Sequence, residues 1–173
     1  AASDVYKRQV SRLSPAKDAI VYDIGAGTGS VSVELAMHAL YGTVYAVERT
    51  KEGCELIAQN ARKFGLDNID IINASAADVI DKLPAADSVF IGGSGGELEK
   101  IMDNVLKKNP GVHIVITAVT LETLNDSVRL MEDKKVDVID IVQIAVTQIK
   151  KRGRYHMLAA NNPVFIIEGR GNR

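Results

Sequence analysis

The stretch Asp23-Ile24-Gly25-Ala26-Gly27-Thr28-Gly29 joins an apolar run, Ala19–Ile24, to a segment of helical spacing that opens around Ser30. A strand, a glycine turn and a helix in this order are typical of a parallel α/β sheet and predict a ligand site at the turn. The glycines do not fit the dinucleotide fingerprint Gly-x-Gly-x-x-Gly, because the third glycine comes one residue early. They do not fit a P-loop either, since no Gly-Lys-Ser/Thr follows.

From about Ala19 onward, short β-branched runs alternate with longer stretches of helical period, which favours a parallel sheet. The expected strands are Ala19–Ile24, Thr43–Glu48, Ile69–Asn73, Ser88–Ile91 and Val112–Ala118, and the expected helices are Lys51–Phe64, Gly96–Lys108 and Leu121–Lys134. The pattern changes after Lys134. There we expect one half-exposed strand, Val136–Ile149, then a loop, Lys150–Asn162, and a last strand, Val164–Glu168. The predicted fold is α/β, with a mainly parallel seven-stranded sheet and a C-terminal antiparallel hairpin.

Composition sets limits on the function. The chain has 173 residues, 46% of them apolar, which predicts one domain over residues 10–173. Its formal charge of −1 predicts no overall attraction to nucleic acid. Ala1–Gln9 is expected to be a non-native or truncated start. No apolar run is long enough to cross a bilayer, so we expect no membrane partner. The lone cysteine, Cys54, excludes an internal disulfide and favours a cytoplasmic location, and we interpret it as a packing thiol. The sequence contains no Cys/His cluster, so it predicts no metal site.

Two acidic residues indicate what the first glycine turn binds. Asp23 precedes Gly25 by two residues, where it would repel a pyrophosphate and suits a cationic group. Glu48 closes the second strand, where a carboxylate accepts hydrogen bonds from both ribose hydroxyls. S-adenosylmethionine (SAM) combines a nucleoside with a positive charge, and an ordinary strand-to-helix turn is the alternative interpretation. The expected cofactor-binding residues are Asp23, Gly25, Ala26, Gly27, Thr28, Gly29, Glu48, Arg49, Ser75 and Ala76.

The adenine of SAM is expected near the end of the third strand, at Asn73-Ala74-Ser75-Ala76. Asn73 and Ser75 can equally be caps of the following helix, and the residues alone leave both interpretations open.

A second glycine cluster, Gly92-Gly93-Ser94-Gly95-Gly96, follows the fourth predicted strand. It carries no Asn/Asp-Pro-Pro-aromatic motif, and Asn161-Asn162-Pro163-Val164 is interpreted as a turn. This cluster is expected to form an open floor of backbone with few side chains. A floor of this kind suits a large flat substrate that approaches the backbone, and its amides can bind an anion.

Charge is distributed unevenly along the chain. Residues 1–149 carry 15 Lys+Arg and 21 Asp+Glu, whereas residues 150–173 carry 6 Lys+Arg and one Glu. The basic cluster Lys150–His156 is expected to overhang the substrate mouth, which suits a polyanionic small molecule; a solvated loop is the alternative. His156 titrates near neutrality, so it can act as a general acid or base, or it can simply pack.

On these residues the chain resembles the decarboxylating precorrin C(15)-methyltransferases of cobalamin biosynthesis, from about Leu13 to Gly169. The similar segments are Asp23–Glu34, Phe90–Gly96, Ala118–Thr123, Tyr155–Leu158 and Asn162-Pro163-Val164. The resemblance implies a class I SAM-dependent methyltransferase fold, which is Rossmann-like, with SAM as the cofactor. It also implies a precorrin or cobalt-precorrin substrate, a polycarboxylate tetrapyrrole that is methylated at carbon 15 while a ring acetate loses carbon dioxide.

The resemblance further implies a homotetramer and an N-terminal stretch that helps to cover the cofactor, which Ala1–Gln9 does not resemble. No catalytic acid or base is assigned, because alignment of an electron-rich ring with a sulfonium supplies most of the rate. The expected substrate-binding residues are Gly92, Gly93, Ser94, Gly95, Lys150, Arg152, Arg154, Tyr155 and His156. A tRNA methyltransferase and a non-catalytic SAM-binding module are the two alternatives.

Overall fold

The computed structural model describes residues 10–172. Its main element is a seven-stranded sheet in the order β3-β2-β1-β4-β5-β9-β6. The first five strands in sequence run parallel, as predicted. The strands of this sheet are β1 Ile20–Ile24, β2 Thr43–Glu48, β3 Ile69–Asn73, β4 Ser88–Ile91, β5 His113–Ala118, β6 Val136–Ile144 and β9 Val164–Gly171.

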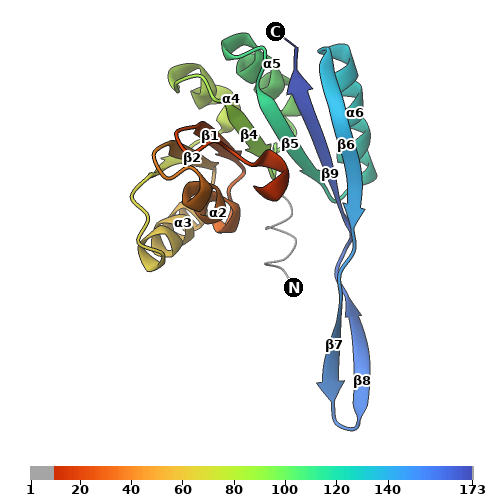
Figure 1. Ribbon diagram of the computed structural model, residues 1–173. Helices are drawn as coiled ribbons and strands as arrows, with labels where there is room; N and C mark the ends of the chain where they lie inside the picture. Colours follow the sequence, from red (N-terminus) through yellow and green to blue (C-terminus); the bar gives the residue numbers. More distant parts are fainter. Residues whose placement is uncertain (1–9, 173) are drawn as a thin grey trace.

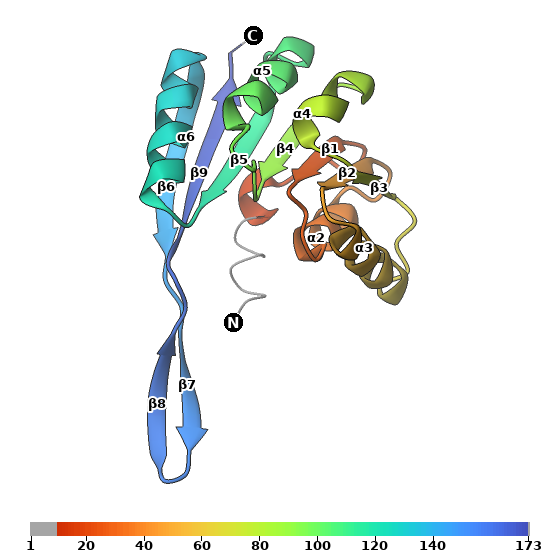
Figure 2. The same cartoon turned by 180° about the vertical axis from the view of Figure 1, so that it is seen from behind.

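Helices cover both faces of the sheet (Figures 1 and 2). Apolar side chains of α2 and α3 pack on one face, and those of α4, α5 and α6 pack on the other. The helices are α2 Ser30–His38, α3 Lys51–Lys63, α4 Ala76–Val79 with a 3-10 turn at Ile80–Lys82, α5 Leu98–Lys108 and α6 Leu121–Asp133. α5 begins two residues later than predicted, because Gly95 and Gly96 adopt positive φ values of 58° and 85°, which a helix excludes.

The core lies on both sides of the central strands. Alternate residues of a strand point to opposite faces, so Ile114 and Ile116 join the layer under α5 and α6 while Val115 joins the layer under α2. A sheet that is covered on both faces needs apolar residues at consecutive positions. The continuous apolar runs at β1, β4 and β5 therefore have a direct structural cause.

The order of the strands creates a crevice at the carboxyl ends of β1 and β4. β2 and β3 extend the sheet on one side of β1, and β4 and β5 extend it on the other. The loops that follow β1 and β4 consequently leave toward opposite faces, and open α/β sheets bind ligands in such a crevice.

The last strand fills a place inside the sheet. β9 is antiparallel to both of its neighbours, β5 and β6, so the predicted antiparallel hairpin at the C-terminal side is confirmed. Since β9 opposes both, β6 runs in the same direction as β5.

Two sequence-based expectations in this region were wrong. Val136–Ile149 is not one strand, because the chain leaves the sheet after Ile144, and Lys150–Asn162 is not a loop. The chain instead forms a second, two-stranded sheet of β7 Thr147–Arg152 and β8 Tyr155–Ala160. This hairpin extends away from the rest of the molecule (Figure 1). Its strands are solvated on both faces, so they lack the apolar alternation that identifies a strand in a sequence.

Within residues 10–172, no helix is long and apolar enough to span a membrane.

Candidate functional site

The two glycine turns meet at the carboxyl ends of β1 and β4. Gly25 has φ of 70°, and a Cβ at this position would lie 2.4 Å from the carbonyl oxygen of Gly93. The amides of Gly92 and Gly93 both donate to the carbonyl oxygen of Ile24, at 2.9 and 3.3 Å. The turns therefore touch backbone to backbone, and this contact requires glycine at position 25.

Glu48 is fixed at the end of β2, where its carboxylate faces the first turn. One oxygen, Oε2, accepts from the amide of Gly27 at 2.9 Å, and the other, Oε1, accepts from the amide and the hydroxyl of Thr50, both at 2.9 Å. Partial burial opposes ionisation, but the hydrogen bonds from Thr50 and Gly27 outweigh it, so the pKa of Glu48 is lowered. Glu48 is thus an ionised acceptor held in one orientation.

Asp23 is fully buried beside the first turn. Its Oδ2 accepts a hydrogen bond from the hydroxyl of Ser32, while its Oδ1 has no hydrogen-bond partner within the described residues. Burial raises the pKa of Asp23 to about 7. Asp23 lines a cavity of about 260 Å³ together with residues of the first turn and with Phe90 and Thr117. A buried carboxyl with an unpaired oxygen at a cavity is suited to a cationic group.

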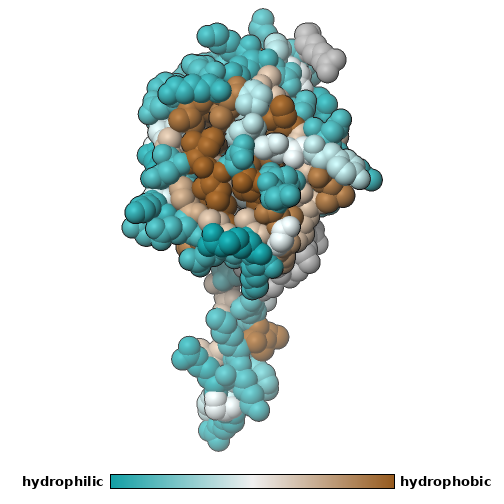
Figure 3. Space-filling view, turned by 90° about the vertical axis from the view of Figure 1, so that its left-hand side faces the viewer, coloured by the Kyte–Doolittle hydropathy of each residue, from teal (hydrophilic) through white to brown (hydrophobic). Residues whose placement is uncertain are grey.

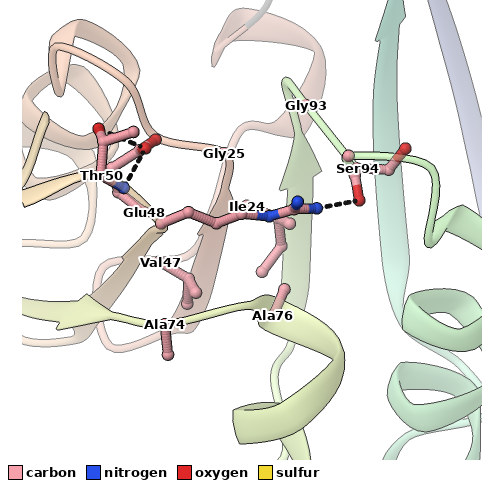
Figure 4. A pocket seen from close by; sticks show the side chains of 11 residues that line it. Ile24, Gly25, Val47, Glu48, Thr50, Ala74, Ala76, Gly93 and Ser94 are labelled. Carbon is pink, nitrogen blue, oxygen red and sulfur yellow. Dashed lines mark hydrogen bonds between the residues drawn. The ribbon is translucent and has the colours of Figure 1, made fainter.

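A larger cavity of about 340 Å³ lies on the other side of the first turn (Figure 4). Ala74 and Ala76, at the start of α4, line it with Val47 and Glu48 of β2. The Ser75 side chain does not cap α4 and donates instead to Glu97 Oε2 at 2.6 Å.

The amide of Asn73 donates to the carbonyl oxygens of Glu48 and Arg49, at 3.0 and 2.8 Å. Neither Asn73 nor Ser75 therefore caps the helix through its side chain. Asn73 holds the ends of β2 and β3 together.

Arg49 bridges the two sides of the cleft. Its Nη2 donates to the carbonyl oxygen of Ser94 at 3.2 Å, the dashed contact that ends on Ser94 in Figure 4, and lies 3.4 Å from Glu97 Oε2. A Cβ on Gly95 would lie 1.5 Å from that same Nη2, so the guanidinium passes over position 95 because this residue is glycine. Arg49 thus connects the strand that carries Glu48 with the second glycine turn.

The second turn opens on its other side into a cavity of about 260 Å³. Residues 91–96 line it together with Thr117, Val119 and Thr123. Gly92 and Thr117 also line the cavity beside Asp23, so the two spaces adjoin at the second turn. The expected floor of backbone and small side chains is therefore next to the expected position of the cationic group.

The structure does not bring the basic residues of the C-terminal region into this cleft within one chain. Lys150, Arg152, Tyr155 and His156 lie on β7 and β8, and Arg154 lies in the turn between them. The Arg154 guanidinium donates to the Tyr155 hydroxyl at 3.0 Å and lies over its ring, with 5.2 Å to the centroid.

Sequence reasoning missed three residues that shape the cleft: Thr50, Glu97 and Thr117. Thr50 had a usable signal, since a threonine directly before a helical stretch is a typical N-cap, and its hydroxyl accepts from Gly53 N at 3.2 Å. Glu97 and Thr117 carry no comparable local signal, because their roles depend on the approach of distant strands.

Cys54 is partly buried on α3, and its thiol contacts the carbonyl oxygen of Glu48 at 3.6 Å. Burial and the neighbouring Glu48 raise its pKa, which disfavours the reactive thiolate and agrees with a packing role. Within residues 10–172, no group of three or more His, Cys, Asp or Glu side chains is placed to hold a metal ion.

Comparison with known proteins shows the family to which the chain is similar. A family model described as a precorrin methyltransferase domain matches residues 2–169. The cobalt-precorrin-6B C(15)-methyltransferase (decarboxylating) of Salmonella typhimurium LT2 is 34% identical over 159 residues, which cover 91% of this chain and 82% of that protein. The crystal structure of precorrin-6Y C5,15-methyltransferase from Geobacter metallireducens GS-15 has a TM-score of 0.88 and 38% identity, covering 96% of this chain and 86% of that chain.

A SAM-dependent O-methyltransferase from Thermotoga maritima shares the fold alone, with a TM-score of 0.76 and 17% identity over 98% of this chain and 66% of that chain. These likenesses confirm the predicted class I methyltransferase fold.

Proposed function

The chain belongs to the precorrin methyltransferase domain family, and from this we propose that it uses SAM to methylate carbon 15 of a precorrin, with loss of carbon dioxide from a ring acetate. The observation that carries the proposal is the contact between the two glycine turns, with the unpaired Oδ1 of Asp23 beside it. A cationic methyl donor and a flat ring can meet at such a contact without an intervening side chain.

We place SAM across the first turn. Glu48 would accept hydrogen bonds from its ribose hydroxyls, because the hydrogen bonds with Gly27 and Thr50 already fix this carboxylate. Ala74 and Ala76 would line the space for its adenine, and Asp23 would face its cationic end. An uncompensated buried carboxyl is costly, so a cation that restores its charge balance binds there favourably.

SAM supplies an electrophilic methyl group, and the chain's own residues align it with the ring carbon. Asp23 and Glu48 would hold the cationic end and the ribose of the donor, while the backbone at Gly92 and Gly93 lets the ring approach closely. No proton need be removed by a side chain, because the ring carbon is itself nucleophilic and carbon dioxide departs from the substrate. Alignment in a cleft of this kind can account for about 7–11 kcal/mol of a barrier.

We further propose that the protein is a homo-oligomer, a tetramer by resemblance to its family, with a cytoplasmic location. The hairpin of β7 and β8 supports assembly, since a two-stranded hairpin alone is marginally stable in water. The single free cysteine supports a reducing compartment.

The proposal is tested by incubating the protein with methyl-labelled SAM and either the metal-free or the cobalt-containing acidic corrin precursor. We expect label in the ring and release of carbon dioxide in equal amounts with one of the two. Label transferred to tRNA instead would favour a tRNA methyltransferase. Binding of SAM without turnover on any of these substrates would favour a non-catalytic module.

A further inference from the structure

The hairpin of β7 and β8 leaves the molecule at the edge that carries the glycine turns. Because β6 runs in the same direction as β5, its carboxyl end lies at the cleft edge of the sheet. The hairpin continues outward from that end, as Figures 1 and 2 show from opposite sides. Of its strand residues, only Gln148 and Ala159 are even partly buried.

One face of the hairpin combines positive charge with apolar surface. Lys150 lies opposite Met157 and Arg152 lies opposite Tyr155 in the antiparallel register, and alternation places all four on the same face. The Tyr155 and Met157 side chains are exposed. Lys150 and Arg152 have no ion-pair partner within residues 10–172. Such a face can hold a flat ring that carries carboxylates.

The hairpin is also the most basic part of the chain. Residues 147–160 contain four Lys and Arg and no Asp or Glu, whereas residues 1–149 carry 15 basic and 21 acidic residues. The hairpin is largely hydrophilic in the space-filling view, with an apolar patch on its side (Figure 3). Its charge is therefore complementary both to the body of another copy and to a polyanion.

The described residues that line the cleft provide no free cationic side chain. Among the residues that line its three cavities, Arg49 is the single Lys, Arg or His, and it already pairs with Glu97 at 3.4 Å. A polycarboxylate bound there would lie near the carboxyl groups of Asp23, Glu48 and Glu97, and the one nearby cation, Arg49, already pairs with Glu97. Like charges in one cleft repel each other, so the described residues of one chain do not complete a site for this substrate.

We propose that the hairpin of one copy lies over the substrate cleft of a second copy, where Lys150 and Arg152 bind substrate carboxylates and Tyr155 and Met157 contact the ring. The proposal rests on the proposed function, since it assigns the cations that bind that function's substrate. The partner is a second copy because the chain's own hairpin extends away from its own cleft. An assembly with closed symmetry gives each cleft the hairpin of a neighbour.

The decisive experiment is complementation between two inactive full-length variants that carry different tags. The first, Asp23→Asn with Glu48→Ala, is expected to bind SAM too weakly for turnover but has an intact hairpin. The second, Lys150→Gln with Arg152→Gln, has an intact cleft. Mixed assemblies are isolated through both tags and assayed for methyl transfer to the corrin precursor. We expect turnover at least tenfold above either variant alone, because the intact cleft then receives an intact hairpin from its neighbour.

Single variants supply a matched control. Arg152→Gln should raise the KM for the corrin precursor about tenfold and leave the Kd of SAM unchanged, whereas Lys151→Gln removes the same charge from the opposite face and should change neither. Mixed assemblies with no more turnover than their parents would overturn the proposal, and so would full turnover by a monomer. If the unmodified protein itself transfers no methyl group, the proposed function fails and takes this proposal with it.

Discussion

At the scale of single residues, the buried carboxyl of Asp23 destabilises the fold, and the same carboxyl is proposed to bind the cationic end of SAM. The Asp23 carboxyl is completely buried, and one of its oxygens has no hydrogen-bond partner among residues 10–172, an arrangement that most proteins avoid. Burial raises its pKa from the ordinary value of 3.8 to about 7. The folded protein therefore binds a proton at Asp23 between these two pH values, while the unfolded chain has released it.

The stability of the ligand-free protein should consequently fall as pH rises from about 4 to about 7 and level off above that range, by at most a few kcal/mol. The affinity for SAM should change in the opposite direction, rising up to about pH 7, because a cation binds the ionised carboxylate. Thermal unfolding and calorimetric titration between pH 4 and 8 measure both effects. Asp23→Asn should flatten both profiles, whereas Asp70→Asn, at an exposed position of β3, should leave them unchanged. Identical profiles for wild type and Asp23→Asn would contradict this role.

Glu48 gives a second prediction at this scale. Its lowered pKa keeps it ionised above the acid range, and a carboxylate fixed by Gly27 and Thr50 should bind ribose without reorganising. Glu48→Ala should therefore weaken SAM binding by about 1–3 kcal/mol, or roughly 5- to 150-fold. Isothermal titration calorimetry at pH 7 measures this, with Glu52→Ala, an exposed acid in the first turn of α3, as the control. An unchanged affinity of Glu48→Ala for SAM would show that the ribose does not bind at Glu48.

At the scale of elements, the site depends on the contact between the turn after β1 and the turn after β4. Gly25→Ala would place its Cβ 2.4 Å from the Gly93 carbonyl oxygen and would hold alanine at φ of 70°. Gly65→Ala is a matched control, because its φ is 65° but nothing lies within 4 Å of the added Cβ.

Urea unfolding should show that Gly65→Ala lowers the free energy of unfolding by about 1 kcal/mol, because only backbone strain is added there. Gly25→Ala should lose at least about 2 kcal/mol more, because the two turns must separate, and it should also lose SAM binding. Equal losses in the two variants would show that the turns do not depend on their mutual contact.

The sequence predicted these elements unevenly, for reasons that differ from one element to another. β2, β3 and β4 match their predicted bounds because each is buried or flanked by clear turn residues. The two glycine turns were found because glycine is needed where φ is positive and backbones touch. The Arg49 bridge to Ser94 and Glu97 could not be found, since it depends on how closely β2 approaches the turn after β4. β7 and β8 were missed because strands exposed on both faces carry no apolar alternation.

At the scale of the whole molecule, charge and shape separate into two parts. The body holds the cleft and most of the acidic residues, and the hairpin holds an excess of basic ones. The sequence indicated this asymmetry correctly, but it could not show that the hairpin extends away from the cleft of its own chain. That direction follows from the three-dimensional path of β6 and β9, which carry the hairpin beyond the edge of the sheet.

The separation predicts that the hairpin can be removed without unfolding the body. Ile144 and Val164 lie opposite each other where β6 and β9 enter the hairpin, so residues 145–163 can be replaced by a two-residue Asn-Gly turn. All β6–β9 pairs remain, and no core cluster loses a buried side chain. The shortened protein should therefore remain folded, with a single cooperative thermal transition, and bind SAM with unchanged affinity.

If the hairpin links the copies and supplies their cations, as proposed, the shortened protein should at the same time lose its assembly and its turnover of the corrin precursor. Analytical ultracentrifugation, calorimetric titration with SAM and the labelled-methyl assay measure these three properties on one preparation. Retained turnover in a monomeric shortened protein would show that the cleft of one chain is sufficient. Loss of SAM binding in a folded shortened protein would instead show that the hairpin and the cofactor cleft are not independent, contrary to their separation in the fold.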